Sequence, residues 1–174
     1  SRSKVVAAIS SLKGAVLVKP NGTRKYVGAY KGFRELFSAG RISKIPHLHC
    51  VQTSAIMPIV AAYDGVDWMS EDASQTSAEG IAVGVPARKN QVLDILSITE
   101  GVAVAVEESE IDFWRSKLGS DEGILAEATS VVVFAGVKKL MNKGVISPED
   151  PLLMPITGFG LKDLPHSLGN SRFH

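Results

Sequence analysis

Hydrophobic and polar positions alternate along this chain between helical spacing and short continuous apolar runs. Apolar side chains recur every three or four residues in several segments, which is typical of helices with one buried face. Between them lie short apolar runs of the kind found in strands buried on both faces. The helical spacing predicts helices over residues 4–12, 27–39, 55–63, 90–98 and 130–141. It also predicts a helix capped by Ser109, in which Ile111, Trp114 and Leu118 share a face. The apolar runs predict strands over residues 15–18, 47–51, 102–106 and 152–156.

The order of these elements predicts the fold class. Buried strands separated by helices imply right-handed crossovers and a mostly parallel sheet. We therefore expect an α/β fold with three layers, in which helices cover both faces of the sheet. Residues 1–174 are expected to form a single domain, with a long loop over 64–84 and an irregular polar tail over 164–174.

Composition narrows the class of protein. The 174 residues are 45% hydrophobic and 21% charged, as in a soluble globular domain. A net charge of +1, with basic residues spread along the chain, gives no reason to expect nucleic acid or a membrane surface as partner. No apolar run approaches the roughly 20 residues of a membrane helix. The single cysteine, Cys50, cannot form an internal disulfide, so we expect a reducing, cytoplasmic location.

Two segments have the composition of a ligand-binding turn. Asn21-Gly22-Thr23 lies between a predicted strand and a predicted helix, where successive amide groups and the helix dipole can cradle a phosphate. Thr157 and Gly158 follow the last predicted strand, and they offer a hydroxyl group and close approach of the backbone. Each pattern is also common in ordinary turns.

Histidines suggest a metal site only weakly. His47 and His49 point to the same face of a predicted strand, whereas Cys50 points to the opposite face. No further ligand has matching spacing, so we predict no metal site.

Other catalytic patterns are weaker still. Glu107, Glu108 and Glu110 resemble an acid pair, but they lie at a predicted helix N-terminus, where carboxylates stabilise the helix dipole. Helix capping is therefore the better interpretation. The sequence has neither a Gly-x-Ser-x-Gly elbow nor a Walker loop.

Several short segments follow one another in a recognisable order. They are 15–18, 21–23, 28–36, 40–42, 45–46, 51–52, 78–81, 122–124, 135–136 and 157–163. In order and spacing, these segments resemble the C-terminal half of threonine synthase and its relatives, the fold-type-II pyridoxal-phosphate enzymes.

This resemblance implies roles for individual residues. The turn Asn21, Gly22 and Thr23 corresponds to the one that holds the cofactor phosphate in the family. Thr157, followed by Gly158, corresponds to the hydroxyl residue that hydrogen-bonds the pyridine nitrogen. The implied cofactor is pyridoxal 5'-phosphate, whose chemistry the protein orients and tunes.

The sequence departs from the family pattern in three places. No segment matches the one that carries the Schiff-base lysine, so we assign no catalytic residue to this chain. Residues 24–27 separate Thr23 from Gly28, where relatives are shorter and more apolar, although Arg24 and Lys25 favour an anion. Ala128 occupies a place usually given to proline.

The function implied by the resemblance is that of a threonine-synthase-like lyase, which converts O-phosphohomoserine to threonine and phosphate. This chain would be a C-terminal fragment of such an enzyme and inactive alone. Two alternatives remain open: another pyridoxal-phosphate-dependent amino-acid lyase or dehydratase, or a non-catalytic domain that binds a small anion or a partner chain. The expected partners are an amino-acid substrate and either the missing N-terminal half or another copy of the chain, in a homo-oligomer.

Overall fold

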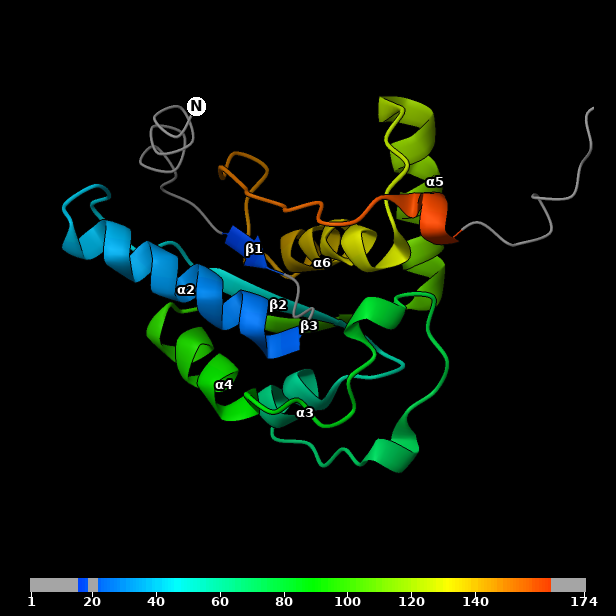
Figure 1. Cartoon of the computed structure of the whole chain (residues 1–174), viewed down its shortest axis with the longest axis horizontal. Coiled ribbons are helices and arrows are strands. Elements are labelled where there is room, and N and C mark those ends of the chain that lie inside the picture. The colour runs from blue at the N-terminus through cyan, green and yellow to red at the C-terminus, as the bar shows by residue number, and fades with distance from the viewer. Residues whose placement is uncertain (1–15, 19–21, 164–174) are drawn as a thin grey trace, which may run out of the picture.

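A computed structural model describes residues 16–18 and 22–163, and its centre is a parallel sheet (Figure 1). The strands in this described part are β1 (Val16–Val18), β2 (Leu48–Thr53) and β3 (Ala103–Val106). Their order is β1-β2-β3, and each neighbouring pair is parallel. The small parallel sheet confirms the predicted mixed α/β character.

Helices connect and cover these strands. The α-helices are α2 (Gly22–Ser38), α3 (Pro58–Asp64), α4 (Lys89–Ile98), α5 (Glu108–Glu122) and α6 (Ala128–Asn142). Short 3-10 helices are η1 (Ser70–Asp72), η2 (Glu79–Ile81) and η3 (Gly160–Asp163). No helix in the described ranges is both long and apolar enough to cross a bilayer.

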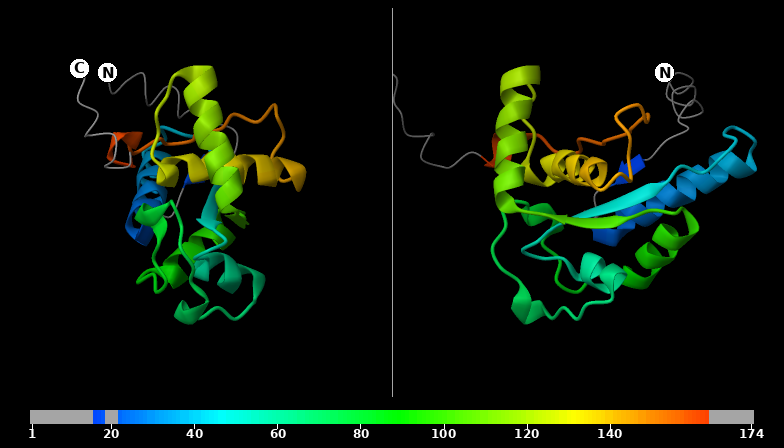
Figure 2. Two further views of the ribbon diagram at one scale, coloured as in Figure 1. Left: turned by 90° about the vertical axis from the view of Figure 1, so that its right-hand side faces the viewer. Right: turned by 180° about the vertical axis from the view of Figure 1, so that it is seen from behind.

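The sheet lies between two groups of helices (Figures 1 and 2). Leu48 and Cys50 of β2 pack into an apolar cluster with α2, α3 and α4. Val51, which points to the opposite face, packs with α6 instead. The alternation of side chains along β2 thus supplies both apolar layers. Helix α5 packs on α6 and lies across its end (Figure 2).

Most predicted elements are confirmed, with shifts at their ends. The strands predicted over 15–18, 47–51 and 102–106 correspond to β1, β2 and β3. The helix predicted over 27–39 begins earlier, at Gly22, so the predicted phosphate turn overlaps the first turn of α2. The other helices predicted within the described ranges correspond to α3, α4, α5 and α6.

The predicted last strand, over residues 152–156, is wrong: this segment forms no strand in the structure. Pro151 precedes the segment and Pro155 lies within it, and a proline has no N–H group to donate to a neighbouring strand. Leu153 and Ile156 are also well exposed, so the apolar run is not a buried strand. Apolar composition alone could not reveal this.

The remaining predictions concern loops and ends. The expected long loop over 64–84 contains the two short helices η1 and η2. The helix predicted over 4–12 and the tail predicted over 164–174 lie outside the described residues.

Candidate functional site

The carboxyl ends of the parallel strands meet at one edge of the sheet. Thr53, the last residue of β2, pairs with Val106, the last residue of β3. Helix α2 begins shortly after β1, and α5 begins shortly after β3. In open parallel sheets this edge is where ligands bind.

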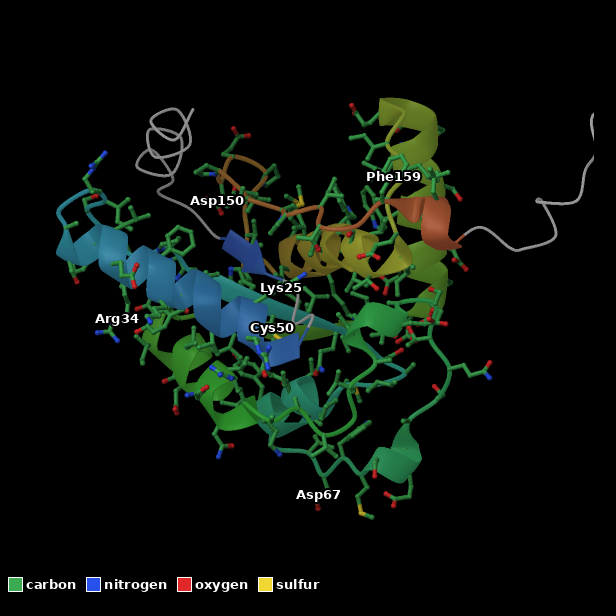
Figure 3. All side chains as sticks on the ribbon, viewed as in Figure 1. Lys25, Arg34, Cys50, Asp67, Asp150 and Phe159 are labelled. Atoms are coloured by element: carbon green, nitrogen blue, oxygen red, sulfur yellow. The ribbon has the colours of Figure 1, made fainter. Side chains whose placement is uncertain are left out.

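The head of α2 has the donors of an anion site. Gly22 and Thr23 form part of its first turn, where backbone N–H groups lack acceptors within the helix. That turn contains no acidic residue, and the side chains of Arg24 and Lys25 are exposed. Figure 3 shows Lys25 at this end of α2. Amide donors, the helix dipole and two cations together favour a bound anion. Asn21, the other residue of the predicted turn, lies outside the described residues.

Tyr26 anchors this helix head on the sheet. Its side chain is fully buried, and its hydroxyl donates a 2.7 Å hydrogen bond to the Leu48 carbonyl. Burial and the nearby Cys50 raise the pKa of the Tyr26 hydroxyl, so the hydroxyl stays protonated as the donor. The Thr23 side chain beneath the first turn is also buried.

A second cluster joins residues 157–158 to the head of α6. The backbone N–H groups of Thr157 and Gly158 donate to the Ser130 hydroxyl oxygen at 3.2 and 3.0 Å. The Glu127 N–H group donates to the Gly158 carbonyl at 3.2 Å. A Cβ atom on Gly158 would lie 2.0 Å from the Glu127 carboxyl carbon. The predicted close backbone approach at Gly158 therefore exists, while the Thr157 side chain is exposed.

Each predicted pair thus lies at a helix head, but on a different helix. Gly22 and Thr23 belong to α2, whereas Thr157 and Gly158 lie against α6.

Sequence analysis missed the role of Glu108. Its carboxylate accepts hydrogen bonds from the Thr53, Thr76 and Ser77 side chains and from the Ser77 N–H group. Burial pushes the Glu108 pKa upward, but these hydrogen bonds outweigh it and hold the pKa below the usual glutamate range. The predicted capping is confirmed for Glu110, whose carboxylate accepts the Glu107 N–H group at 2.8 Å.

The histidines have structural partners. His49 is buried, and its Nδ1 accepts a 3.0 Å hydrogen bond from the Val102 N–H group. His47 Nδ1 donates to the Thr99 carbonyl at 2.7 Å. Within the described portion of the chain, no group of three or more His, Cys, Asp or Glu side chains could hold a metal ion. Cys50 is buried in the sheet (Figure 3), and burial raises its thiol pKa.

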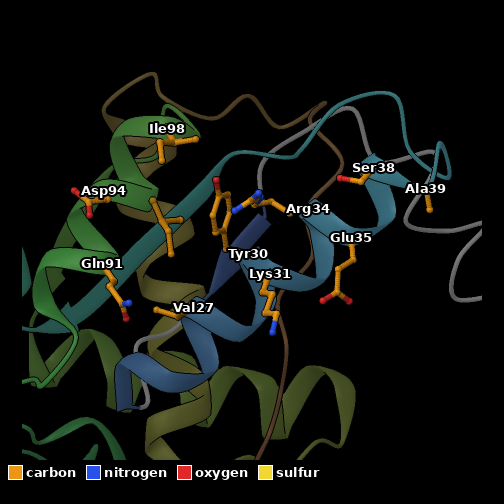
Figure 4. Close-up of a pocket in the computed structure, with 11 residues that line it drawn as sticks. Val27, Tyr30, Lys31, Arg34, Glu35, Ser38, Ala39, Gln91, Asp94 and Ile98 are labelled. Atoms are coloured by element: carbon orange, nitrogen blue, oxygen red, sulfur yellow. The ribbon is translucent and has the colours of Figure 1, made fainter.

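A groove of about 770 Å³ lies between α2 and α4 (Figure 4). Val27, Tyr30 and Ile98 line it, together with the charged side chains of Arg34 and Asp94. None of the residues that sequence analysis assigned to a site lines this groove. The groove is therefore separate from both helix-head clusters.

Comparison with protein families matches residues 10–158 to the family described as pyridoxal-phosphate dependent enzyme. Among curated relatives, the chain is 32% identical over 150 residues to threonine synthase from Methanocaldococcus jannaschii. That alignment covers 84% of this chain but 37% of the relative, so the chain spans little more than a third of that protein's length.

Solved structures show the same fold. Serine racemase from Dictyostelium discoideum matches with a TM-score of 0.64 and 14% identity, covering 91% of this chain and 47% of that one. A fungal L-serine ammonia-lyase from Rhizomucor miehei matches with a TM-score of 0.65 and 16% identity, covering 90% and 49%. The family match extends over most of the sequence, including both helix-head clusters. This chain therefore belongs to the pyridoxal-phosphate-dependent enzyme family, with the fold-type-II architecture.

Proposed function

We propose that this chain binds the phosphate of pyridoxal 5'-phosphate as part of a threonine-synthase-like lyase. The observation that carries the proposal is the head of α2, an anion-binding arrangement at the carboxyl edge of a parallel sheet. The 32% identity to a threonine synthase supports O-phosphohomoserine as the substrate and threonine and phosphate as the products. An amino-acid lyase also agrees with the family match.

The residues present fit the phosphate group of this cofactor. The first-turn amides of Gly22 and Thr23 would hold the phosphate, and Arg24 and Lys25 would add positive charge around it. No carboxylate lies in that turn to oppose an anion. The cofactor, when bound, supplies the electron sink of the reaction.

Thr157 would orient the other end of the cofactor. Its side chain is exposed, while the Ser130 hydroxyl fixes the backbone N–H groups of Thr157 and Gly158. A neutral hydroxyl partner leaves the pyridine nitrogen largely unprotonated. This role rests on the backbone position of residues 157–158, which the head of α6 sets.

The lysine of the reaction would come from outside this chain. Lys139 donates to the Ala105 carbonyl at 2.6 Å, and Lys117 pairs with Asp121 at 2.6 Å, so both have structural partners. We propose that the missing N-terminal half supplies the Schiff-base lysine and that the isolated chain forms no threonine.

A cofactor titration tests the phosphate site. Replacing Arg24 and Lys25 together with alanine is expected to weaken pyridoxal-phosphate binding about tenfold, because each cation near a bound anion contributes up to about 1 kcal/mol. Inorganic phosphate should compete with the cofactor in the unchanged chain. Isothermal titration calorimetry measures both effects.

Lys31→Ala is the matched control, because Lys31 is an exposed lysine further along the same helix. Its affinity for pyridoxal phosphate should equal that of the unchanged chain. Equal affinity in the double variant, or no competition by phosphate, would contradict the assignment of the α2 head.

A further inference from the structure

Glu108, the first residue of α5, connects three parts of the chain. Its Oε1 accepts from the Thr53 hydroxyl at 2.8 Å and from the Thr76 hydroxyl at 2.5 Å. Its Oε2 accepts from the Ser77 N–H group at 2.9 Å and from the Ser77 hydroxyl at 2.8 Å. One carboxylate thus joins the end of β2, the head of α5 and residues 76–77.

The residues held in this way belong to a segment, 74–82, that runs along the carboxyl edge. At one end, the Ser74 N–H group donates to the Ala55 carbonyl at 3.0 Å, just beyond β2. At the other end, the Gly80 N–H group donates to the Thr129 hydroxyl at 3.1 Å, in the first turn of α6. Within the segment, the side chains of Ala78 and Ile81 are buried.

The 74–82 segment forms one wall of a recess at this edge. The recess has a volume of about 520 Å³. It is lined by Ile56 and Ala82 and by the polar side chains of Ser74, Gln75, Thr76, Ser77 and Glu79. Thr76 and Ser77 line the recess and also donate to Glu108, so the position of the carboxylate sets the position of the wall.

The charge of Glu108 suits a tether better than a proton-transfer group. All four of its hydrogen bonds come from donors, which a carboxylate accepts and a neutral carboxylic acid accepts less well. The N-terminus of α5 favours the negative charge further. The carboxyl groups nearest to it along the chain are Glu107, which caps α5, and Glu110 and Asp112 within α5, and Glu79 lies on the segment.

We propose that Glu108 is a positioning residue of the candidate site, an inference that rests on the proposed function. The ionised carboxylate holds the 74–82 segment across the strand ends and places the Gly80 N–H group against the head of α6. This head also carries Ser130, which fixes residues 157–158. Glu108 therefore sets the wall of the recess at the carboxyl edge, and it acts on residues 157–158 only through the head of α6.

Amide hydrogen exchange in the whole 174-residue chain tests this tether without any cofactor. In Glu108→Gln, the amides of residues 76–82 should exchange about tenfold faster, which corresponds to about 1.4 kcal/mol, because the charge-assisted hydrogen bonds that hold the segment become weaker. The interior amides of β2 and α6 should be unchanged. Asp112→Asn, which alters an exposed carboxylate one turn further along α5, should change neither set.

Rescue and pH dependence separate positioning from general support of the fold. Glu108→Asp keeps the charge and should restore part of the protection that Glu108→Gln loses. In the unchanged chain, protection of residues 76–82 should fall as the pH falls through the lowered Glu108 pKa, and this dependence should be absent in Glu108→Gln.

The possible results separate the two proposals. Unchanged protection of 76–82 in Glu108→Gln, or an equal loss throughout β2 and α6, would overturn the tether. Failure of the unchanged chain to bind pyridoxal phosphate would contradict the proposed function, while the exchange result would still decide the role of Glu108.

Discussion

His49 is a buried imidazole whose charge state matters for folding. Its side chain is 2% exposed, and its Nδ1 must be unprotonated to accept from the Val102 N–H group. Burial first, and the nearby His47 second, lower the His49 pKa to about 4. The folded chain therefore holds this side chain neutral where an unfolded chain would not.

Acid should destabilise the chain through His49. Between about pH 6.5 and pH 4 the unfolded state binds one more proton at this residue, so the free energy of unfolding falls as the pH falls. At about pH 4 the free energy of unfolding should be lower by on the order of 3 kcal/mol, since each unit of pKa difference corresponds to roughly 1.4 kcal/mol. Urea unfolding at about pH 7.5 and pH 4.5 measures the difference.

His49→Gln should remove most of this acid loss, because its amide oxygen can still accept a hydrogen bond but does not titrate in this range. His47→Gln, a change at the partly exposed neighbour, should keep most of it. If the free energy of unfolding fell equally with pH in the unchanged chain and in His49→Gln, His49 would not be the group responsible.

For single residues, sequence analysis predicted properties that the residue type carries by itself. Gly158 was predicted to allow close backbone approach, and the structure places it against the Glu127 carboxyl group. The hydrogen-bonding role of Glu108 could not be predicted from the sequence, because its partners Thr53 and Thr76 lie 55 and 32 residues away along the chain. Only the folded sheet edge brings these groups together.

The packing of α6 on β2 depends on a glycine at their crossing. A Cβ atom on Gly136 would lie 2.4 Å from a methyl carbon of Val51, a separation that real Cβ atoms do not show. Both residues are buried where α6 packs on the sheet. The helix can approach the sheet this closely only without a side chain at position 136.

Gly136→Ala should therefore lower the free energy of unfolding, by about 1–3 kcal/mol from overpacking, despite the higher helix propensity of alanine. Gly32→Ala is the matched comparison, since a Cβ atom at Gly32 in α2 would meet nothing within 4 Å. That variant should be stabilised by up to about 1 kcal/mol. Urea unfolding of both variants decides the matter: a stabilised Gly136→Ala would show that α6 can move away at little cost.

The prediction of helices and strands succeeded for most segments with a clear apolar pattern and failed at two places. Helix α6 and strand β3 have clear patterns, and both were predicted close to their observed ends. The first turn of α2 was missed because Gly22, Arg24 and Lys25 show no apolar period, although the helix begins there. Residues 152–156 are apolar but form no strand, since the pattern carries no information about a pairing partner.

In the whole molecule, the two outermost strands of the sheet, β1 and β3, differ in what lies beside them. The outer edge of β3 is covered in part by Lys139, whose ammonium group donates to the Ala105 carbonyl. Strand β1 pairs with β2 on one side, and the described residues include no strand on its other side. The alignment with a curated relative covers 37% of that protein, which agrees with the proposal that another part of the enzyme completes the site.

We propose that this chain carries a phosphate-binding half-site without the reactive lysine. An absorbance titration of the chain with pyridoxal phosphate, followed by borohydride reduction and mass spectrometry, tests this proposal. We expect binding that inorganic phosphate reverses, and no cofactor fixed to a single lysine after reduction. Stoichiometric attachment to one lysine of this chain, or no phosphate-sensitive binding at all, would refute the proposal.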